Sequence, residues 1–209
     1  MPPRVIPCLL LRDRGLVKTI KFKKDVYLGD PVNVVRIFND KEAEELILLD
    51  IDATRENRGP DFELVSEIAG ECFMPVAYGG GIRTFSDVQR LIRCGIEKVV
   101  INSAAYLSLD VIRSASETYG AQAVVAAIDV RKSMFGGYKL YAESGHAEKS
   151  VKLADHVTAV VAAGAGEVLV NNIDRDGTMG GYDVDLIRQV CANTNTPVIA
   201  CGGAGSVEH

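Results

Sequence analysis

Short apolar segments alternate with longer amphipathic segments along almost the whole chain. The short segments are apolar at successive positions rather than at every second one, which is typical of strands buried on both faces of a sheet. The longer segments have the period of helices that bury one side. Repeated β–α units of this kind predict an α/β fold with a parallel sheet covered by helices.

The element boundaries follow from this alternation. We expect strands at residues 5–11, 46–51, 75–78, 98–101, 123–128, 167–171 and 197–200. We expect helices at residues 31–44, 62–71, 85–94, 109–119, 154–163 and 183–192. Because no linker or low-complexity segment interrupts the pattern, we predict a single domain over residues 1–209.

The chain also repeats itself weakly. Glycine-rich turns begin at residues 79 and 202, an offset of 123, and the strands opened by Glu45 and Glu167 are offset by 122. Two half-barrel repeats of four β–α units explain these offsets, and they predict a (β/α)8 TIM barrel. The repeat of strand 98–101 would then lie near residue 221, so we expect the eighth β–α unit to be missing from this 209-residue sequence.

Composition narrows the classes of partner. The net charge of -5 argues against a nucleic-acid surface, which needs a basic face. No apolar run is long enough for a membrane span or a signal peptide, so we expect a cytoplasmic protein. The five cysteines are scattered, without a C-x-x-C pair, and we expect free thiols, no metal site and no cofactor.

Glycine turns that follow strands indicate where a phosphorylated small molecule binds. In a parallel barrel these turns lie at the carboxyl-terminal rim, with backbone N–H groups available to an anion. We expect one anion site at Gly81 with Asn102 and Ser103. The residues expected at a second site, on the opposite side, are Asp176, Gly177, Gly202 and Gly203. The alternative is that these glycines only permit tight turns.

Asp129 ends a predicted strand at the same rim, and we interpret it as a general acid or base. The alternative is an aspartate that caps the following turn. The half-barrel repeat pairs Asp129 with Leu10, which cannot exchange a proton. Asp13 lies three residues further on and is a weak substitute.

Four charged residues lie at the starts of four different predicted strands: Arg4, Glu45, Lys98 and Glu167. Strand starts form the bottom face of a barrel, so these residues would make a ring of two cations and two anions around its mouth. Charges on this face commonly serve stability, and that reading is the alternative.

Seven segments carry a family resemblance: RVIPCL (4–9), LLDID (48–52), GGGIR (79–83), KVVINSAA (98–105), AIDVR (127–131), GAGEVLVNNIDRDGTMGGYD (164–183) and PVIACGGAGS (197–206). In this order they resemble the cyclase subunit of imidazole glycerol phosphate synthase. That resemblance implies a (β/α)8 barrel with a glutaminase subunit docked on its bottom face. Ammonia would pass through the barrel to a phosphorylated substrate at the top.

The resemblance also implies roles for single residues. Lys18 matches a lysine that contacts substrate, and Asp129 matches one catalytic aspartate. Gly81, Asn102 and Ser103 match one phosphate site, and Gly177 and Gly203 match part of the other. The charged ring matches the gate of the ammonia passage.

Several positions depart from the family pattern. The second catalytic aspartate falls at Leu10, residues 11–16 and 143–152 differ, and a threonine is replaced by Asn171. The segment RDRGLVKT (12–19) resembles a paralogue subgroup linked to the synthesis of acetamidino sugars for surface polysaccharide. There the barrel would pass ammonia to a separate sugar amidotransferase.

Three functions therefore stay open. The first is ammonia delivery for acetamidino-sugar synthesis. The second is a histidine-pathway cyclase that makes imidazole glycerol phosphate and AICAR from PRFAR and ammonia. The third is a non-catalytic phosphate-binding scaffold.

Overall fold

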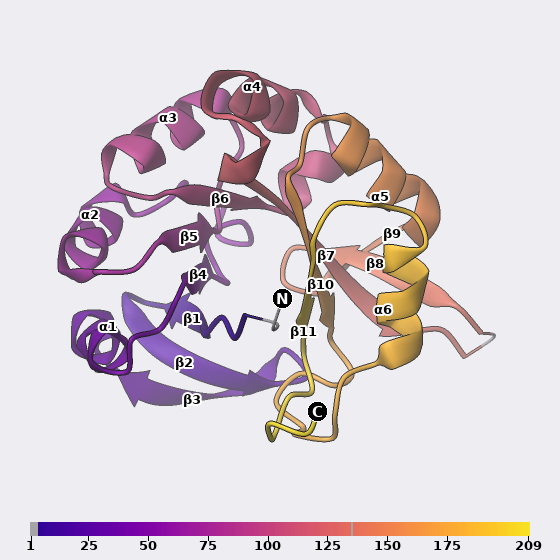
Figure 1. Cartoon of the computed structure of the whole chain (residues 1–209), viewed down its shortest axis with the longest axis horizontal. Helices are drawn as coiled ribbons and strands as arrows, with labels where there is room; N and C mark the ends of the chain where they lie inside the picture. The colour runs from indigo at the N-terminus through magenta and orange to yellow at the C-terminus, as the bar shows by residue number, and fades with distance from the viewer. Residues whose placement is uncertain (1–3, 135) are drawn as a thin grey trace. The chain divides into compact units, whose positions relative to one another are not determined.

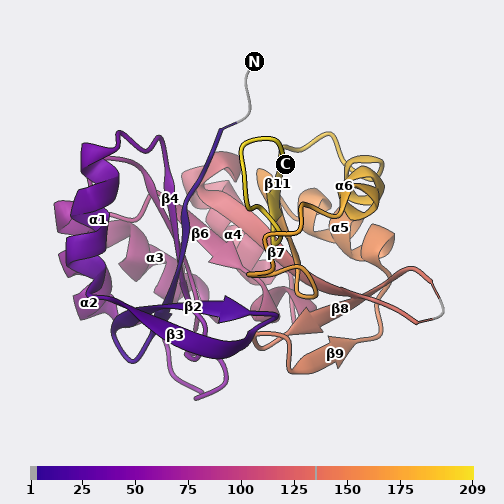
Figure 2. The same ribbon diagram turned by 90° about the horizontal axis from the view of Figure 1, so that it is seen from below.

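The computed structural model describes residues 4–134 and 136–209. It consists of two compact units. Unit 1 comprises residues 4–18 and 26–100, and unit 2 comprises residues 19–25 and 101–209. Figures 1 and 2 show the chain in two views, and each unit is described by itself below.

Unit 1 is built on a parallel sheet. Its strands pair in the order β1 (Cys8–Arg12), β4 (Leu46–Asp50), β5 (Val76–Gly79) and β6 (Lys98–Ile101). Helices α1 (Pro31–Asp40), α2 (Phe62–Glu71) and α3 (Phe85–Arg93) cover one face of this sheet, as Figure 1 shows. Leu46, Leu48 and Ile68 are fully buried where the helices and strands meet. The alternation of strand and helix is the one that the sequence predicts.

Unit 2 repeats this arrangement. The strand β7 (Val124–Lys132) pairs in parallel with β10 (Glu167–Asn172), which pairs with β11 (Val198–Cys201). Short 3-10 turns, η1 (Ser103–Tyr106) and η2 (Ala121–Ala123), flank α4 (Asp110–Tyr119), and α5 (Leu153–Ala162) and α6 (Val184–Cys191) follow. Ile128, Val130, Val157 and Val190 belong to a buried cluster between sheet and helices.

Two extensions of the sheet by hairpins were not expected from the sequence. β1 turns back into β2 (Gly15–Ile20), and β3 (Lys23–Gly29) lies beside β2, with residues 19–25 of this hairpin assigned to unit 2. In unit 2, β7 continues past Asp129 to pair with β8 (Tyr138–Ala142), which pairs with β9 (Ala147–Lys149). Figure 2 shows each hairpin beyond the carboxyl ends of the strands in its own unit.

The turn between β1 and β2 explains why the sequence did not reveal that pairing. Asp13 and Arg14 both have positive φ, 48° and 61°, as a two-residue turn requires. Glycine, asparagine or aspartate usually marks such a turn, and Arg14 is none of these. The prediction that Asp129 ends its strand was wrong, because pairing with β8 extends β7 to Lys132. Gly136 and Gly137, at positive φ just before β8, are the signal that the sequence did carry there.

The coarse fold prediction is confirmed: parallel β–α units, with helices on one face of a curled sheet, build both units in the manner of a TIM-barrel half. Each predicted strand and helix overlaps an observed one, and the first helix ends earlier than expected, at Asp40. Within the described residues, no helix has the length and apolar character that a membrane crossing demands.

Asp183 should be a major stabilising residue of unit 2. Its carboxylate accepts hydrogen bonds from Leu186 N, Tyr138 Oη and Asn172 Nδ2, and it caps α6. Asp183→Ala removes the cap and leaves a buried amide donor unpaired, so we expect a loss of about 2–4 kcal/mol in the free energy of unfolding.

Denaturant unfolding of both variants measures this effect. Asp185→Ala, on the exposed side of the same helix, is the matched control and should change stability by less than about 0.5 kcal/mol. Equal losses in the two variants would contradict the role of Asp183.

Candidate functional site

Asp129 lies in a row of polar side chains on the sheet of unit 2. It is in register with Asn171 on β10, which is in register with Cys201 on β11. Because side chains in register on parallel strands point to the same face, the three form one row. Asn171 is the most buried of them, with 7% of its surface exposed.

Two further side chains act on the Asp129 carboxylate. Asn102, directly after β6, donates a hydrogen bond from Nδ2 to Asp129 Oδ2 at 3.1 Å. The carboxylate of Asp176 contributes a second negative charge near Asp129. Asp176 is itself held in place, because Thr19 Oγ1 and Phe22 N donate to it at 2.7 and 3.3 Å.

These surroundings raise the pKa of Asp129 to about 7. Burial is the largest cause, the charge of Asp176 adds to it, and the Asn102 hydrogen bond opposes it. A carboxyl group with such a pKa exchanges protons near neutral pH, which suits a general acid or base. The capping alternative is not needed to explain its position, since Asp129 lies within β7.

The structure brings together the residues expected at the second anion site. The loop 173–183 packs against the turn that begins at Gly202, and Gly181 N donates to Gly203 O at 2.8 Å. A Cβ at Gly177 would come within 2.2 Å of Thr19 O, and one at Gly203 within 2.2 Å of Gly181 O. Close backbone approach therefore requires both glycines, whatever ligand binds.

The first expected anion site is divided between the units. Gly81 lies in unit 1, where its N–H points to Thr54 Oγ1 at 3.4 Å. Asn102 and Ser103 lie in unit 2, where Ser103 Oγ accepts from Glu143 N at 3.1 Å. Their assembly into one site stays a prediction.

Leu10 lies in an apolar row on the sheet of unit 1. It is in register with Leu49, which is in register with Gly79, and Gly79 with Val100. No titratable side chain belongs to this row. Lys18, which the family resemblance matches to a substrate-contacting lysine, lies on β2 with its side chain exposed.

Three of the four predicted gate residues meet at the start of the strands in unit 1. Glu45 is 1% exposed and accepts from Arg4 Nη1 at 2.9 Å and from Lys98 Nζ at 2.7 Å. Glu167, the fourth, is 8% exposed at the start of β10 in unit 2. Completion of the ring by Glu167 stays a prediction.

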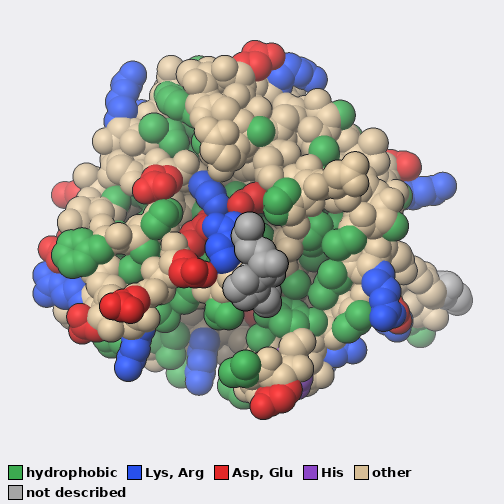
Figure 3. Space-filling view, in the orientation of Figure 1, with side chains coloured by type: hydrophobic (Ala, Val, Ile, Leu, Met, Phe, Trp, Pro, Cys, Tyr) green, Lys and Arg blue, Asp and Glu red, His purple; other side chains and the backbone are tan. Residues whose placement is uncertain are grey.

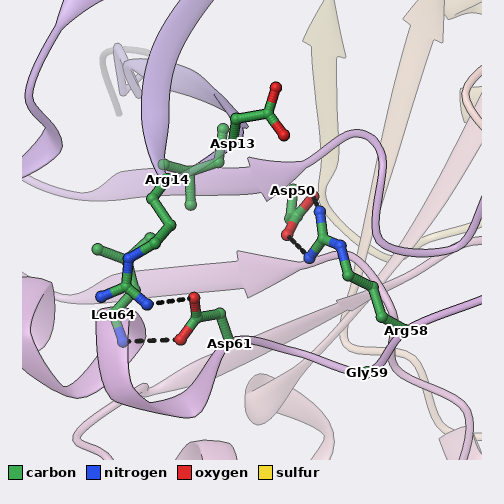
Figure 4. A pocket seen from close by; sticks show the side chains of 8 residues that line it. Asp13, Arg14, Asp50, Arg58, Gly59, Asp61 and Leu64 are labelled. Carbon is green, nitrogen blue, oxygen red and sulfur yellow. Dashed lines mark hydrogen bonds and ion pairs between the residues drawn. The ribbon is translucent and has the colours of Figure 1, made fainter. Parts of the chain in front are cut away.

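Sequence reasoning missed a charged cavity in unit 1, shown in Figure 4. It has a volume of about 460 Å³ and lies where β1 and β4 end, beside the start of α2. Arg58 makes two hydrogen bonds to Asp50, at 2.7 and 3.1 Å, and Arg14 pairs with Asp61 at 2.6 Å. Asp13 lines the same cavity. The only sequence signal was Asp50, a carboxylate at the end of a strand.

The described residues offer no candidate metal centre. Residues 4–134 and 136–209 contain no group of three or more His, Cys, Asp or Glu side chains placed to hold an ion. Asp129 and its neighbours can support proton transfer and hydrogen bonding.

Comparison with known proteins shows which family this chain is similar to. The profile of the family described as "Histidine biosynthesis protein" matches residues 4–209. "Putative imidazole glycerol phosphate synthase subunit hisF2" of Pseudomonas aeruginosa is 52% identical over 98% of this chain and 81% of its own. "Putative imidazole glycerol phosphate synthase subunit hisF3" of Vibrio vulnificus is 45% identical over 98% and 79%. "Imidazole glycerol phosphate synthase subunit HisF" of Natranaerobius thermophilus is 42% identical over 98% and 81%.

The raised pKa of Asp129 makes stability depend on pH. The folded state holds the proton up to about pH 7 and the unfolded state only up to about 3.8, so stability falls as pH rises between these values. Asp129→Asn should therefore be more stable than the wild type at pH 8, by on the order of 2 kcal/mol. The gain is smaller than the full pKa shift would give, because some solvent reaches the carboxylate and screens its charge. The difference should vanish near pH 4, as measured by urea unfolding.

The neighbours of Asp129 provide the control for this prediction. In a ¹³C NMR titration, Asn102→Leu should raise the pKa of Asp129 further, and Asp176→Asn should lower it. Shifts in the same direction for both variants would contradict the assignment of causes.

Proposed function

We propose that this chain, which belongs to the histidine biosynthesis protein family and is HisF-like, is an ammonia-conducting barrel that serves an acceptor enzyme other than a histidine-pathway cyclase. In this proposal both units form one barrel domain. A glutaminase subunit supplies ammonia at the starts of the strands, and a separate amidotransferase uses it to make an acetamidino sugar for surface polysaccharide.

The observation that carries the proposal is the buried Glu45 with its two cations, next to an apolar sheet face. At the level of Lys98, that face of unit 1 presents Cys8, Ile47 and Ala77 in register with the lysine, and the apolar Leu10 row comes next. An apolar surface excludes ammonium, whose charge is costly to desolvate, but it admits neutral ammonia. Charges at the entrance and apolar residues behind them are what selective passage of ammonia requires.

Exposed apolar side chains near this entrance support a docked partner. Val5 is 81% exposed, and Phe73, at the start of the segment that leads into β5, is 89% exposed. The backbone of Phe73 is held by a hydrogen bond from its N–H to Asn39 Oδ1 at 3.0 Å. Figure 3 shows hydrophobic, basic and acidic side chains intermixed on the face seen in Figure 1. A fixed, exposed aromatic residue suits the centre of an interface, and the relatives are named as subunits.

Leu10 is the residue that distinguishes the proposed function from that of a cyclase. Loss of one catalytic carboxylate commonly costs about 10²–10⁴ in rate. The apolar neighbours of Leu10 in its row offer no substitute within unit 1. We propose that the predicted anion sites at Gly81 with Asn102 and Ser103, and at Gly177 with Gly203, hold a phosphorylated ligand without this cyclisation.

One observation favours the second candidate, a cyclase of the histidine pathway. Asp129 has a pKa of about 7 and lies beside Asn102, as a working acid or base would. In that case Asp13, three residues after Leu10 and in the charged cavity of unit 1, is our candidate for the second acid.

The proposed gate predicts a specific effect of Lys98→Met. In the complex with its glutaminase and acceptor enzymes, glutamine-driven product formation should fall at least about tenfold, because a buried charge pair at the entrance is broken. Product formation with added ammonium salt should stay within about twofold of the wild type, since ammonia then arrives without passing the gate.

Arg36→Met is the matched control for this experiment. It also removes a cation that pairs with a glutamate in unit 1, but this ion pair, with Glu71, is exposed. It should leave both activities unchanged. Equal losses with glutamine and with ammonium in Lys98→Met would mean that the ion pair is structural only.

Complementation tests whether cyclisation was given up. Expressed from its complete gene, the protein should fail to rescue a bacterial histidine auxotroph that lacks its cyclase subunit. Its ammonia-dependent cyclisation of PRFAR should be at least about 100-fold slower than that of a HisF control, because one carboxylate is absent. Rescue at the level of the control would establish the second candidate instead.

A further inference from the structure

Arg131 is a partly buried cation without an anionic partner. Among residues 4–134 and 136–209 it forms no ion pair, and its Nε is buried with no hydrogen-bond acceptor. Its guanidinium lies 5.0 Å from the centre of the Tyr141 ring. Leaving a buried charged donor unpaired is costly, so such a group is usually satisfied by a ligand or a carboxylate.

The strand register places Arg131 next to the site already described. Asp129 and Arg131 are two residues apart on β7, so their side chains emerge on the same face, with Cα atoms roughly 7 Å apart. Lys132, the next residue, faces the opposite way. On β8 the partners across the ladder are Tyr141 for Asp129 and Lys139 for Arg131.

Lys139, the residue opposite Arg131 on β8, is already paired. Glu148 accepts from Lys139 Nζ at 2.6 Å and from Tyr141 Oη at 3.2 Å. Lys139 is therefore occupied by a carboxylate, whereas Arg131 is not. The turn at Gly145 lies beside the guanidinium, since a Cβ there would come within 3.5 Å of Arg131 Nη2. A Cβ at this glycine would also crowd Phe22 and Ile173, at 3.0 and 3.2 Å, so the turn packs closely on this side of the cation.

We propose that Arg131 is an anion-binding residue of the Asp129 site and that it takes the carboxylate or phosphate group of a small acidic ligand. The planar guanidinium can donate two parallel hydrogen bonds to either group, and it lies over the aromatic ring of Tyr141. An anionic group on Arg131 places the ligand atoms two or three bonds away within reach of Asp129. This assignment is independent of ammonia delivery, because it concerns the ligand and not the gate.

The test is calorimetric titration of the protein alone with three probes: ribose 5-phosphate, glucuronate and neutral ribose. Wild-type protein should bind at least one of the two anions and not ribose, and the stronger anion identifies the group. Arg131→Met keeps an apolar stem over Tyr141 and should weaken that binding about 10- to 100-fold, as expected for charge-assisted hydrogen bonds. Arg131→Lys should lose less.

Lys132→Met is the matched control, since it removes the same charge one residue away on the opposite face. It should not change the affinity by more than about twofold. Equal weakening by Arg131→Met and Lys132→Met, no weakening by either, or no anion binding by the wild type would each overturn the assignment. The experiment distinguishes binding at Arg131 from binding at the predicted site of Gly177 and Gly203, because binding at the latter would survive Arg131→Met.

A measurement on the wild type guards against a variant that fails to fold. The Nε–H resonance of Arg131, identified by its absence in Arg131→Lys or Arg131→Met, should shift on addition of the bound anion and not with ribose. An unchanged resonance at saturating anion would overturn the proposal even if both variants were unstable.

Discussion

Parallel pairing in a fixed register is the constraint on which the site depends. In unit 2 the ladder runs from Glu167 opposite Val125 to Asn172 opposite Val130, and it sends Ile128 and Val130 into the core. Asp129, the residue between them, must then emerge on the other face. A slip of one residue would bury the carboxylate among the helices and expose the core, so packing and chemistry fix the same register.

The polar row of unit 2 and the row of unit 1 that contains Leu10 differ in chemistry. The first carries Asp129 and Asn171, and the second carries Leu10 and Leu49. A leucine at this level is compatible with the fold, because the position is only half-buried. A leucine in place of an acid therefore leaves the packing of this sheet undisturbed, as the proposed change of function requires.

Much of this organisation was predictable, and the exceptions have physical causes. Periodicity located the strands and helices and drew attention to Asp129, although β7 continues past it to Lys132. The β1–β2 turn was not predictable, because Arg14 adopts positive φ without the glycine that usually announces it. Arg131 and Asp50 were also missed as functional candidates. Their meaning lies in which partners they have or lack, and only the packed structure determines that.

Stability alone does not explain why charged residues are buried at the start of the strands in unit 1. Desolvating Glu45 to 1% exposure costs free energy that Arg4 and Lys98 only offset, and apolar residues of similar size often stabilise a protein as well or better. One cation, Arg4, keeps about half of its side chain in solvent, so the cluster is buried at the carboxylate and open at its edge. The proposed ammonia gate needs such an edge, since a small molecule must reach the cluster from solvent or from a docked partner.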